Sequence, residues 1–512
     1  MWISRTAGLC AAVLGFSAAA RAEAPLSAID WLSQSVATPA AMPVLPKAVE
    51  PAVSHGALPG DISVQSIDGP SVDAVGLLPV SVTGLPRDLW GPTPTADLVA
   101  LIRAQPAAAM PALKQLVQSL LLAELDPPVD SDGRGLLFLA RIDRLLEIGA
   151  LDPAMALLDQ AGTTNPETFR RWFDVALLTG AEDRTCATLR DRPDVAPTIP
   201  ATIFCLAQNG DWAAAATTLH SALALGAIDA EEEALLSRFL DPELFEGEPP
   251  LPVPTRLSPL NWRMMEAIGQ PLATNALPLA FAHGDLRANT GWKGQIEAAE
   301  RLTRSGALGP NRLLGLYDAG KPAASGSVWD RAAAMQAFDR DLAAKDPDAL
   351  AVSLPRVWAQ MVDAELEVAF ADLFGESLAK LPLHGAAAAL AFRIGLLSPA
   401  YEAVALDRPG GSVDENFWAA VARGDLASAA PADQLGTTIR DGFTRAPPPD
   451  LAALIAERRL GEVILRSTLL ISKGAVGEVA DISAGLSGLR AVGLEDAARR
   501  AALQLLLLER RG

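Results

Sequence analysis

Apolar residues recur at helical spacing over most of the chain. Several segments place them three or four residues apart, so that each set forms one stripe on a helix. One such stripe contains Trp358, Val362, Leu366, Ala369 and Leu373, and another contains Leu494, Ala497, Ala501, Leu505 and Leu508. No comparable series alternates with a period of two. The pattern therefore predicts short amphipathic helices from Thr95 to the C-terminus.

The turns between these stripes share a simple sequence pattern. A glycine followed by aspartate occurs at residues 209–212, 283–286 and 423–426. Glycine adopts the left-handed conformation that ends a helix, and aspartate accepts from the free amides that begin the next one. This punctuation resembles that of tetratricopeptide-like and other α-solenoid proteins, although the glycines are unevenly spaced. The resemblance implies an all-α, irregular array of stacked helical hairpins.

Two proline-rich stretches divide the chain. Residues 23–94 contain eleven prolines and few charges, so we expect a largely extended segment that no long helix crosses. Residues 76–90 are too apolar for a free linker, and we expect them to lie along the first helices with Trp90 buried. Four prolines between Pro249 and Pro254 predict a boundary between helical-repeat domains at 95–247 and 255–512, with a C-terminal cap over residues 451–508. Residues 62–67 and 75–82 are candidates for short extended pieces.

The first 22 residues have the composition of a signal peptide. Arg5 precedes an apolar run at residues 7–20, and Ala20-Arg-Ala22 supplies small residues for cleavage. We expect cleavage near Ala22 and a periplasmic location. No second stretch is apolar enough to cross a bilayer, so we expect no integral membrane span.

The charge excludes one class of partner. The formal net charge is −19, and no run of Lys or Arg occurs, whereas nucleic-acid binding requires a positive surface. We therefore expect no nucleic acid among the partners.

The cysteines predict a disulfide. Cys10 falls in the signal peptide, which leaves Cys186 and Cys205 as a pair in an oxidising compartment. A turn near residues 191–194 would place them on antiparallel helices at similar heights. The alternative is two buried free thiols.

No catalytic, metal or cofactor motif stands out. The four histidines have no Cys, His or Glu at ligand spacing, and Ser377-Leu-Ala-Lys380 lacks the companion motifs of an acyl enzyme. Trp262 and Trp292, beside Arg263 and Lys293, are the candidates for an exposed binding surface.

The sequence thus favours a non-enzymatic scaffold or adaptor that binds another envelope protein, in cell-wall, secretion or flagellar machinery. Solenoids offer extended concave surfaces for such binding. A peptidoglycan-associated enzyme and a carbohydrate- or peptide-binding protein remain the alternatives.

Overall fold

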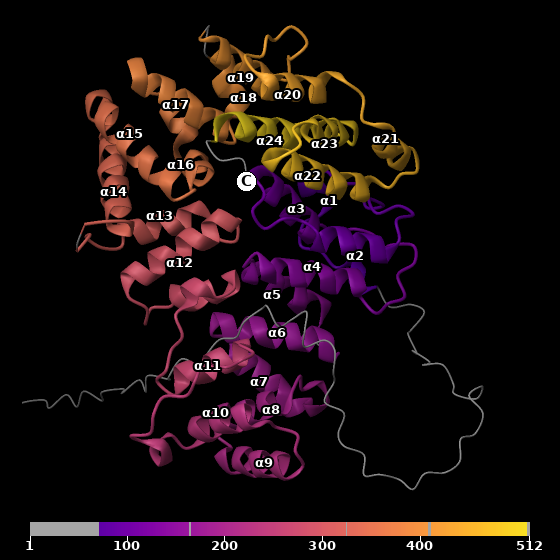
Figure 1. The fold of residues 1–512 in the computed structure, drawn as a ribbon, viewed down its shortest axis with the longest axis vertical. Helices are drawn as coiled ribbons and strands as arrows, with labels where there is room; N and C mark the ends of the chain where they lie inside the picture. Colours follow the sequence, from indigo (N-terminus) through magenta and orange to yellow (C-terminus); the bar gives the residue numbers. More distant parts are fainter. Residues whose placement is uncertain (1–70, 163–164, 324, 408–410, 509–512) are drawn as a thin grey trace, which may run out of the picture.

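The computed structural model describes residues 71–162, 165–323, 325–407 and 411–508. This part of the chain is all-α, as predicted, and contains 24 α-helices and no named β-strand (Figure 1). The predicted signal peptide and the extended piece at residues 62–67 lie outside the described residues. No helix of the described segments has both the length and the apolar character that crossing a membrane requires.

The helices follow one another with short connections; one described 3₁₀ turn (η) precedes α1 and four others lie between helices. The helices are α1 (Val80–Thr83), α2 (Thr95–Arg103), α3 (Pro111–Leu122), α4 (Leu136–Glu147), α5 (Leu151–Ala161), α6 (Pro166–Thr179), α7 (Glu182–Asp191), α8 (Ile199–Gln208), α9 (Trp212–Ala224), α10 (Ala230–Leu240), α11 (Pro259–Ala267), α12 (Trp292–Ser305), α13 (Pro310–Asp318), α14 (Val328–Ala344), α15 (Pro347–Asp363), α16 (Glu367–Ala379), α17 (Gly385–Leu397), α18 (Tyr401–Leu406), α19 (Val413–Arg423), α20 (Gln434–Thr444), α21 (Pro449–Ala456), α22 (Leu460–Val476), α23 (Ala480–Ala491) and α24 (Glu495–Leu507). The described 3₁₀ turns are η2 (Val72–Ala74), η3 (Pro193–Val195), η4 (Pro242–Phe245), η5 (Thr274–Ala276) and η6 (Leu279–Leu286).

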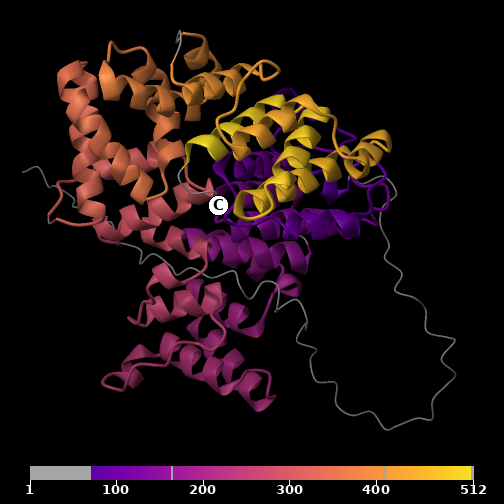
Figure 2. The ribbon, with the colours of Figure 1, turned by 45° about the horizontal axis from the view of Figure 1, so that its top comes forward.

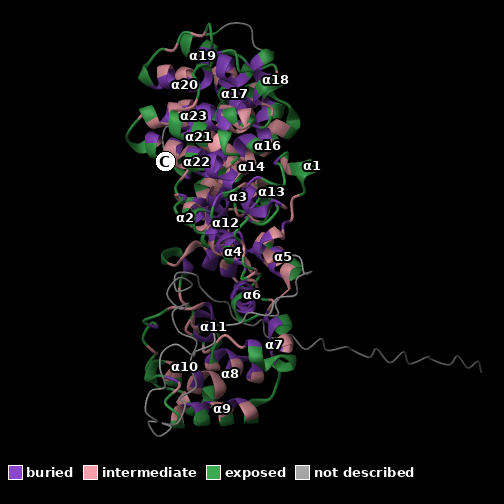
Figure 3. Cartoon of the chain, turned by 90° about the vertical axis from the view of Figure 1, so that its right-hand side faces the viewer, coloured by how far each residue is buried: buried purple, intermediate pink, exposed green. Residues whose placement is uncertain are grey.

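Consecutive helices pack as hairpins, notably α8 with α9, α14 with α15, α16 with α17 and α22 with α23. Figure 3 shows buried residues between the helices and exposed residues on their outer sides. The stripe from Leu494 to Leu508 follows α24, as predicted. The stripe from Trp358 to Leu373 is wrong as a single helix, because α15 ends at Asp363, Glu365 turns the chain with φ 59°, and α16 begins at Glu367.

The glycine–aspartate pattern marks a boundary between two helices at residues 209–212 but not at residues 283–286. Gly210 has φ 86°, and the Asp211 carboxylate accepts from the Ala214 amide at 3.1 Å, as a helix start requires. The turn expected at residues 283–286 lies inside η6, where buried His283 contacts the Gly149 carbonyl oxygen at 2.7 Å. His283 is therefore buried by a contact with a distant segment and does not mark a turn between two helices.

The array does not run in one direction from end to end. Helices α2 and α3 pack against α22 and α24, so early and late helices of the described range lie side by side (Figures 1 and 2). One hydrophobic core cluster accordingly contains residues from Leu85 to Phe281 and from Phe392 to Leu505. The predicted C-terminal cap therefore covers the first helices.

The apolar segment before α2 lies where the sequence predicts. The Leu77 and Leu78 amides donate to the Leu122 carbonyl oxygen at 2.8 and 3.0 Å, and Trp90 is 2% exposed. Extended structure within residues 75–82 is limited to an isolated bridge between Leu78 and Ala123, since Val80–Thr83 forms α1. Trp90 packs on Gly461 of α22, a partner that the sequence did not indicate.

Residues from Ala282 to Leu397, together with Leu508, form a second core cluster. The proline-rich stretch near residue 250 joins η4 to α11, and Leu260 and Trp262 beyond it still belong to the first cluster. The domain division at 247 and 255 stays a prediction.

Candidate binding cleft

A cleft of about 350 Å³ lies where three distant parts of the chain meet. Helix α3 forms one wall, the turn from α12 to α13 forms the second, and the first turns of α16 form the third. In Figure 1, α3 lies to the right of α13 and α16 near the middle of the molecule. The cleft therefore depends on the packing of the N-terminal helices against the middle of the chain.

Long basic side chains tie the three walls together. Lys114 Nζ of α3 donates to the Arg304 carbonyl oxygen at 3.0 Å, across 190 residues of sequence. Arg304 Nη1 in turn donates to the Ala364 carbonyl oxygen at 2.9 Å. Both carbonyls lie at helix C-termini, where cations are stabilised by the helix dipole. These bonds fix the relative positions of α3, α12 and the turn before α16.

Local sequence explains the sharp turns that shape the rim. Gly306 ends α12 in the left-handed conformation, with φ 84°. Pro310 then takes the first position of α13, where its missing amide hydrogen costs nothing. Glu365 precedes α16 with φ 59°, an uncommon conformation for a residue other than glycine.

One buried hydroxyl group at the cleft has no hydrogen-bond partner within the described part of the protein. Thr303 is 8% exposed, and its buried Oγ1 makes no hydrogen bond there. Buried polar groups are normally hydrogen-bonded, so this hydroxyl favours a ligand with hydrogen-bonding atoms of its own.

The remaining lining combines neutral polar and apolar side chains. Gln118 and Ser119 reach the cleft from α3, and Leu78, Leu308 and Leu366 contribute apolar surface. Amides and hydroxyls can both donate and accept, which suits the alternating groups of a peptide backbone.

The cleft lining includes one carboxyl group whose pKa is shifted. Asp372 of α16 reaches solvent at the cleft, yet the surrounding walls displace much of its water. This desolvation raises the pKa of Asp372 to about 6, and Arg500 partly offsets the effect.

The binding surface predicted from Trp262 and Arg263 is wrong. Trp262 and Arg263 are 3% and 1% exposed, and both lie inside the packing of α11. Trp262 Nε1 donates to the Leu272 carbonyl oxygen at 3.1 Å, and Arg263 Nη2 donates to Glu182 at 2.7 Å. Arg263 is buried together with Glu182, and no sequence pattern indicates that these two residues pair.

The other two residues of that prediction do reach the surface. Trp292 is half-buried, donates to the Leu316 carbonyl oxygen at 2.7 Å and packs on Trp329 with ring centroids 5.0 Å apart. Lys293 is exposed, with Nζ 3.5 Å from a Glu297 carboxylate oxygen. Trp292 and Lys293 lie outside the cleft lining.

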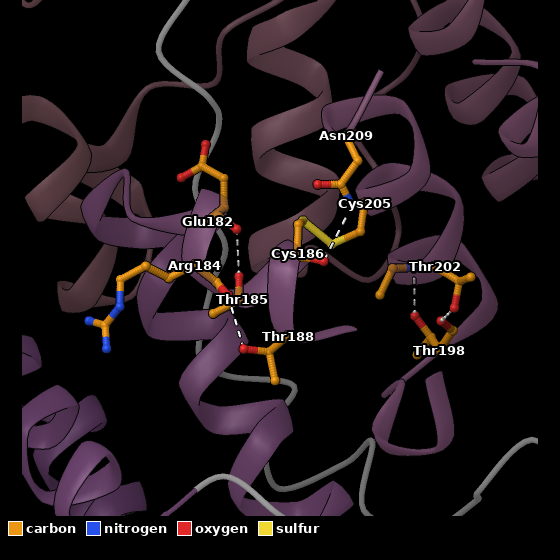
Figure 4. Close-up of a disulfide and its surroundings, with 10 residues drawn as sticks. Glu182, Arg184, Thr185, Cys186, Thr188, Thr198, Thr202, Cys205 and Asn209 are labelled. Carbon is orange, nitrogen blue, oxygen red and sulfur yellow. Dashed lines mark hydrogen bonds between the residues drawn. A yellow bond between two sulfur atoms is a disulfide. The ribbon is translucent and has the colours of Figure 1, made fainter. Parts of the chain in front are cut away.

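The cysteine pair lies at disulfide distance, as the sequence predicts. Cys186 of α7 and Cys205 of α8 have Cα atoms 4.8 Å apart, and both are buried (Figure 4). Asn209 Nδ2 donates to the Cys186 carbonyl oxygen at 3.3 Å, which adds a second link between the two helices.

The cleft residues were not among the candidates from the sequence. They come from segments whose contacts span 60 and 190 residues, and no motif marks them. Within the described ranges, no group of three His, Cys, Asp or Glu side chains could hold a metal ion. Comparisons with known protein families, curated proteins and solved structures find no match for this chain.

Proposed function

We propose that this protein is a non-enzymatic adaptor of the cell envelope that binds a segment of another protein in the cleft. The observation that carries the proposal is the unpartnered Thr303 hydroxyl in a cleft with apolar walls. A peptide segment can satisfy this hydroxyl with its backbone while its side chains contact Leu78, Leu308 and Leu366. Cell-wall, secretion and flagellar assemblies all contain candidate partners.

The volume of the cleft supports a small contact element. About 350 Å³ lies at the low end of the roughly 300–1,000 Å³ typical of ligand pockets. This space accommodates a short stretch of peptide and excludes a folded domain. We therefore expect the partner to insert a loop or a terminus.

Site-specific photo-crosslinking tests the proposal directly. A photoreactive residue at Gln118, which lines the cleft, should capture one defined partner in intact cells. The same residue at Ala452, exposed on α21, is the matched control and should not capture that partner. Equal capture from both positions, or none from Gln118, contradicts binding in the cleft.

A substitution gives an independent measurement. Ser119→Arg fills the cleft from α3 without touching the buried core, since Ser119 is half-exposed. Helical content and thermal unfolding should stay unchanged, while capture of the partner falls at least tenfold. Retained capture would place the partner elsewhere on the protein.

We further propose export to the periplasm with cleavage after Ala22. The signal-like first 22 residues and the cysteine pair at disulfide distance support this location. Mass spectrometry of the protein from fractionated cells should find an N-terminus at Glu23. A retained Met1 in a cytoplasmic fraction would rule out export.

A further inference from the structure

The proline-rich stretch beyond η4 makes a longer connection than its helices require. Helices α10 and α11 pack against each other near the lower end of the molecule (Figure 1), yet residues 246–258 join η4 to α11 without a helix or strand. Residues 225–229 suffice between α9 and α10, which also pack together. Long connections without secondary structure are uncommon in compact domains and are often functional. We call residues 248–254 the proline strap.

The sequence of the proline strap determines its backbone conformation. Every residue from Glu248 to Pro254 either is a proline or precedes one. Proline fixes φ near about −65°, and the residue before a proline is kept out of the helical region. Both constraints favour a polyproline II helix, which has about three residues per turn and no internal hydrogen bonds.

Burial along the proline strap follows this period of three. Leu251 is half-buried and packs on the first core cluster, and Pro254, three residues later, is buried. The residues at the other two positions of each turn are exposed: Pro249, Pro250, Pro252 and Val253. One ridge of the polyproline II helix therefore faces the protein, and two ridges face the solvent.

Two hydrogen bonds hold the backbone of the proline strap against the protein. Arg238 Nη1 of α10 donates to the Pro249 carbonyl oxygen at 2.8 Å. The Leu251 amide donates to Gln270 Oε1, just beyond α11, at 2.9 Å. Because these bonds and the buried ridge fix the strap before any partner arrives, little conformational entropy remains to be lost on binding.

The outward ridges have the features that proline-binding grooves recognise. Pro249 and Pro252 have the PxxP spacing, and such ligands dock with their prolines against aromatic rings. Within the described part of the chain, no backbone amide donates to the carbonyl oxygens of Pro250 and Pro252. These oxygens can accept from the indole N–H or phenol O–H of an aromatic groove.

Charge beside the proline strap indicates the rim of the partner. Glu243 and Glu246 are exposed on its N-terminal side, and Glu248 pairs with Arg238 at 3.0 Å while staying exposed. Arg256 is an exposed cation on the C-terminal side. A partner that covers the N-terminal side therefore gains from basic side chains there, whereas acidic ones would be repelled.

We propose that the proline strap is a ligand for a second protein, one with a groove lined by aromatic side chains and bordered by basic ones. No residue of the strap lines the cleft between α3, α13 and α16. The two surfaces are separate, so binding at the strap does not depend on binding in the cleft.

A WW domain, whose aromatic groove binds extended proline-rich segments, serves as the probe. Titration of the isotope-labelled domain with the purified protein should shift the NMR signals of its groove. Pro252→Ala removes an exposed ridge residue, so it should weaken binding roughly tenfold while thermal unfolding stays unchanged. Pro449→Ala, at an exposed proline of α21, is the matched control and should bind like the unaltered protein. Absence of binding, or equal binding by Pro252→Ala, would overturn the proposal.

Crosslinking in intact cells tests the charge of the natural partner. Capture from a photoreactive residue at Val253 should fall at least tenfold in the double variant Glu243→Lys/Glu246→Lys and also in Pro252→Ala. Ser119→Arg, which fills the cleft, should leave this capture unchanged, so the outcome is distinct from that of the cleft experiment. Absence of capture, or capture that survives the charge reversal or Pro252→Ala, would overturn the proposal.

Discussion

The hairpin of α7 and α8 and the junction of α2 and α3 with α22 and α24 hold helices together in different ways. In the hairpin, the cysteines that join the two helices are 19 residues apart. In the junction, Gln105 bonds to Leu465 across 360 residues, and Gln504 bonds to Ala112 across 392. Neighbours in sequence thus stabilise one region, and the two ends of the chain stabilise the other.

This difference has consequences for what each region tolerates. A hairpin closed by a covalent bond retains its pairing even when the rest of the protein loosens. The junction has no covalent link between its two sides, so it depends on close packing and on a few buried hydrogen bonds. We therefore expect single substitutions to act most strongly at the junction.

Trp90→Ala should have the largest effect of those considered. Trp90 packs on Gly461 so closely that a Cβ there would lie 2.5 Å from a ring carbon, and its buried indole N–H makes no hydrogen bond. Truncating a buried tryptophan costs about 3–5 kcal/mol of unfolding free energy. Urea unfolding at low protein concentration measures this loss. Trp212→Ala, at the half-exposed tryptophan of α9, is the control and should cost little.

Removing the disulfide should have the next largest effect, in the other region. The double variant Cys186→Ala/Cys205→Ala frees a loop whose closure is worth about 3 kcal/mol on the chain-entropy model. Hydrogen exchange should become faster in α7 and α8 and stay unchanged in α22. Faster exchange in α22 as well would show that the two regions unfold together.

A buried hydrogen bond at the junction gives a smaller effect. The Gln105 amide donates to the Leu465 carbonyl oxygen at 3.1 Å, and its oxygen accepts from the Thr468 hydroxyl at 2.8 Å. Gln105→Ala removes both bonds, but the Thr468 hydroxyl can still donate to the Leu465 carbonyl oxygen at 2.8 Å, so we expect a cost of about 1 kcal/mol. A double-mutant cycle with Thr468→Val should give a coupling energy above about 0.5 kcal/mol. Additive effects would mean that the bond contributes nothing to closing the junction.

The stability of the hairpin region should also depend on pH through one buried carboxyl group. Burial raises the pKa of Glu182 in α7 to about 7 from its usual 4.5, although Arg263 partly offsets this. The folded protein therefore binds this proton more tightly than the unfolded chain does. The stabilisation is complete below about pH 4.5 and is lost as the pH rises through about 7.

Glu182→Gln cannot ionise and should flatten this pH dependence between 4.5 and 7. Thermal unfolding of both proteins across that range is the measurement. An unchanged slope in the variant would assign the dependence to other groups.

The same contrast explains which predictions from the sequence succeeded. The stripe on α24, the Asn209-Gly-Asp211 turn and the cysteine pair depend on residues close in sequence, and each lies as predicted. The stripe from Trp358 to Leu373 failed because its regular spacing continues across the turn between α15 and α16. Trp90 was predicted to be buried because its segment is apolar, yet its partner Gly461 left no signal in the pattern. Packing between segments far apart in the sequence produces no periodic pattern of apolar residues.

Trp262 and Arg263 show why the expected binding surface failed. Arginine and tryptophan near polar residues suggest an exposed patch, but Glu182, about 80 residues away, pairs with Arg263 inside the protein. The cleft escaped notice for the related reason that its walls come from three segments. The sequence shows the chemistry of each residue, but it does not show which distant residues folding places beside it.

The contacts of α2 and α3 with α22 and α24 also affect how the protein folds while it is being made. A polypeptide that is synthesised from its N-terminus presents α2 and α3 long before α22 and α24 appear. During that interval Trp90 and the apolar face of α3 lack the surfaces that finally cover them. Such exposed intermediates are vulnerable to aggregation and proteolysis. Successful biogenesis therefore requires either rapid delivery of the last helices or a chaperone that shields the first ones until they come.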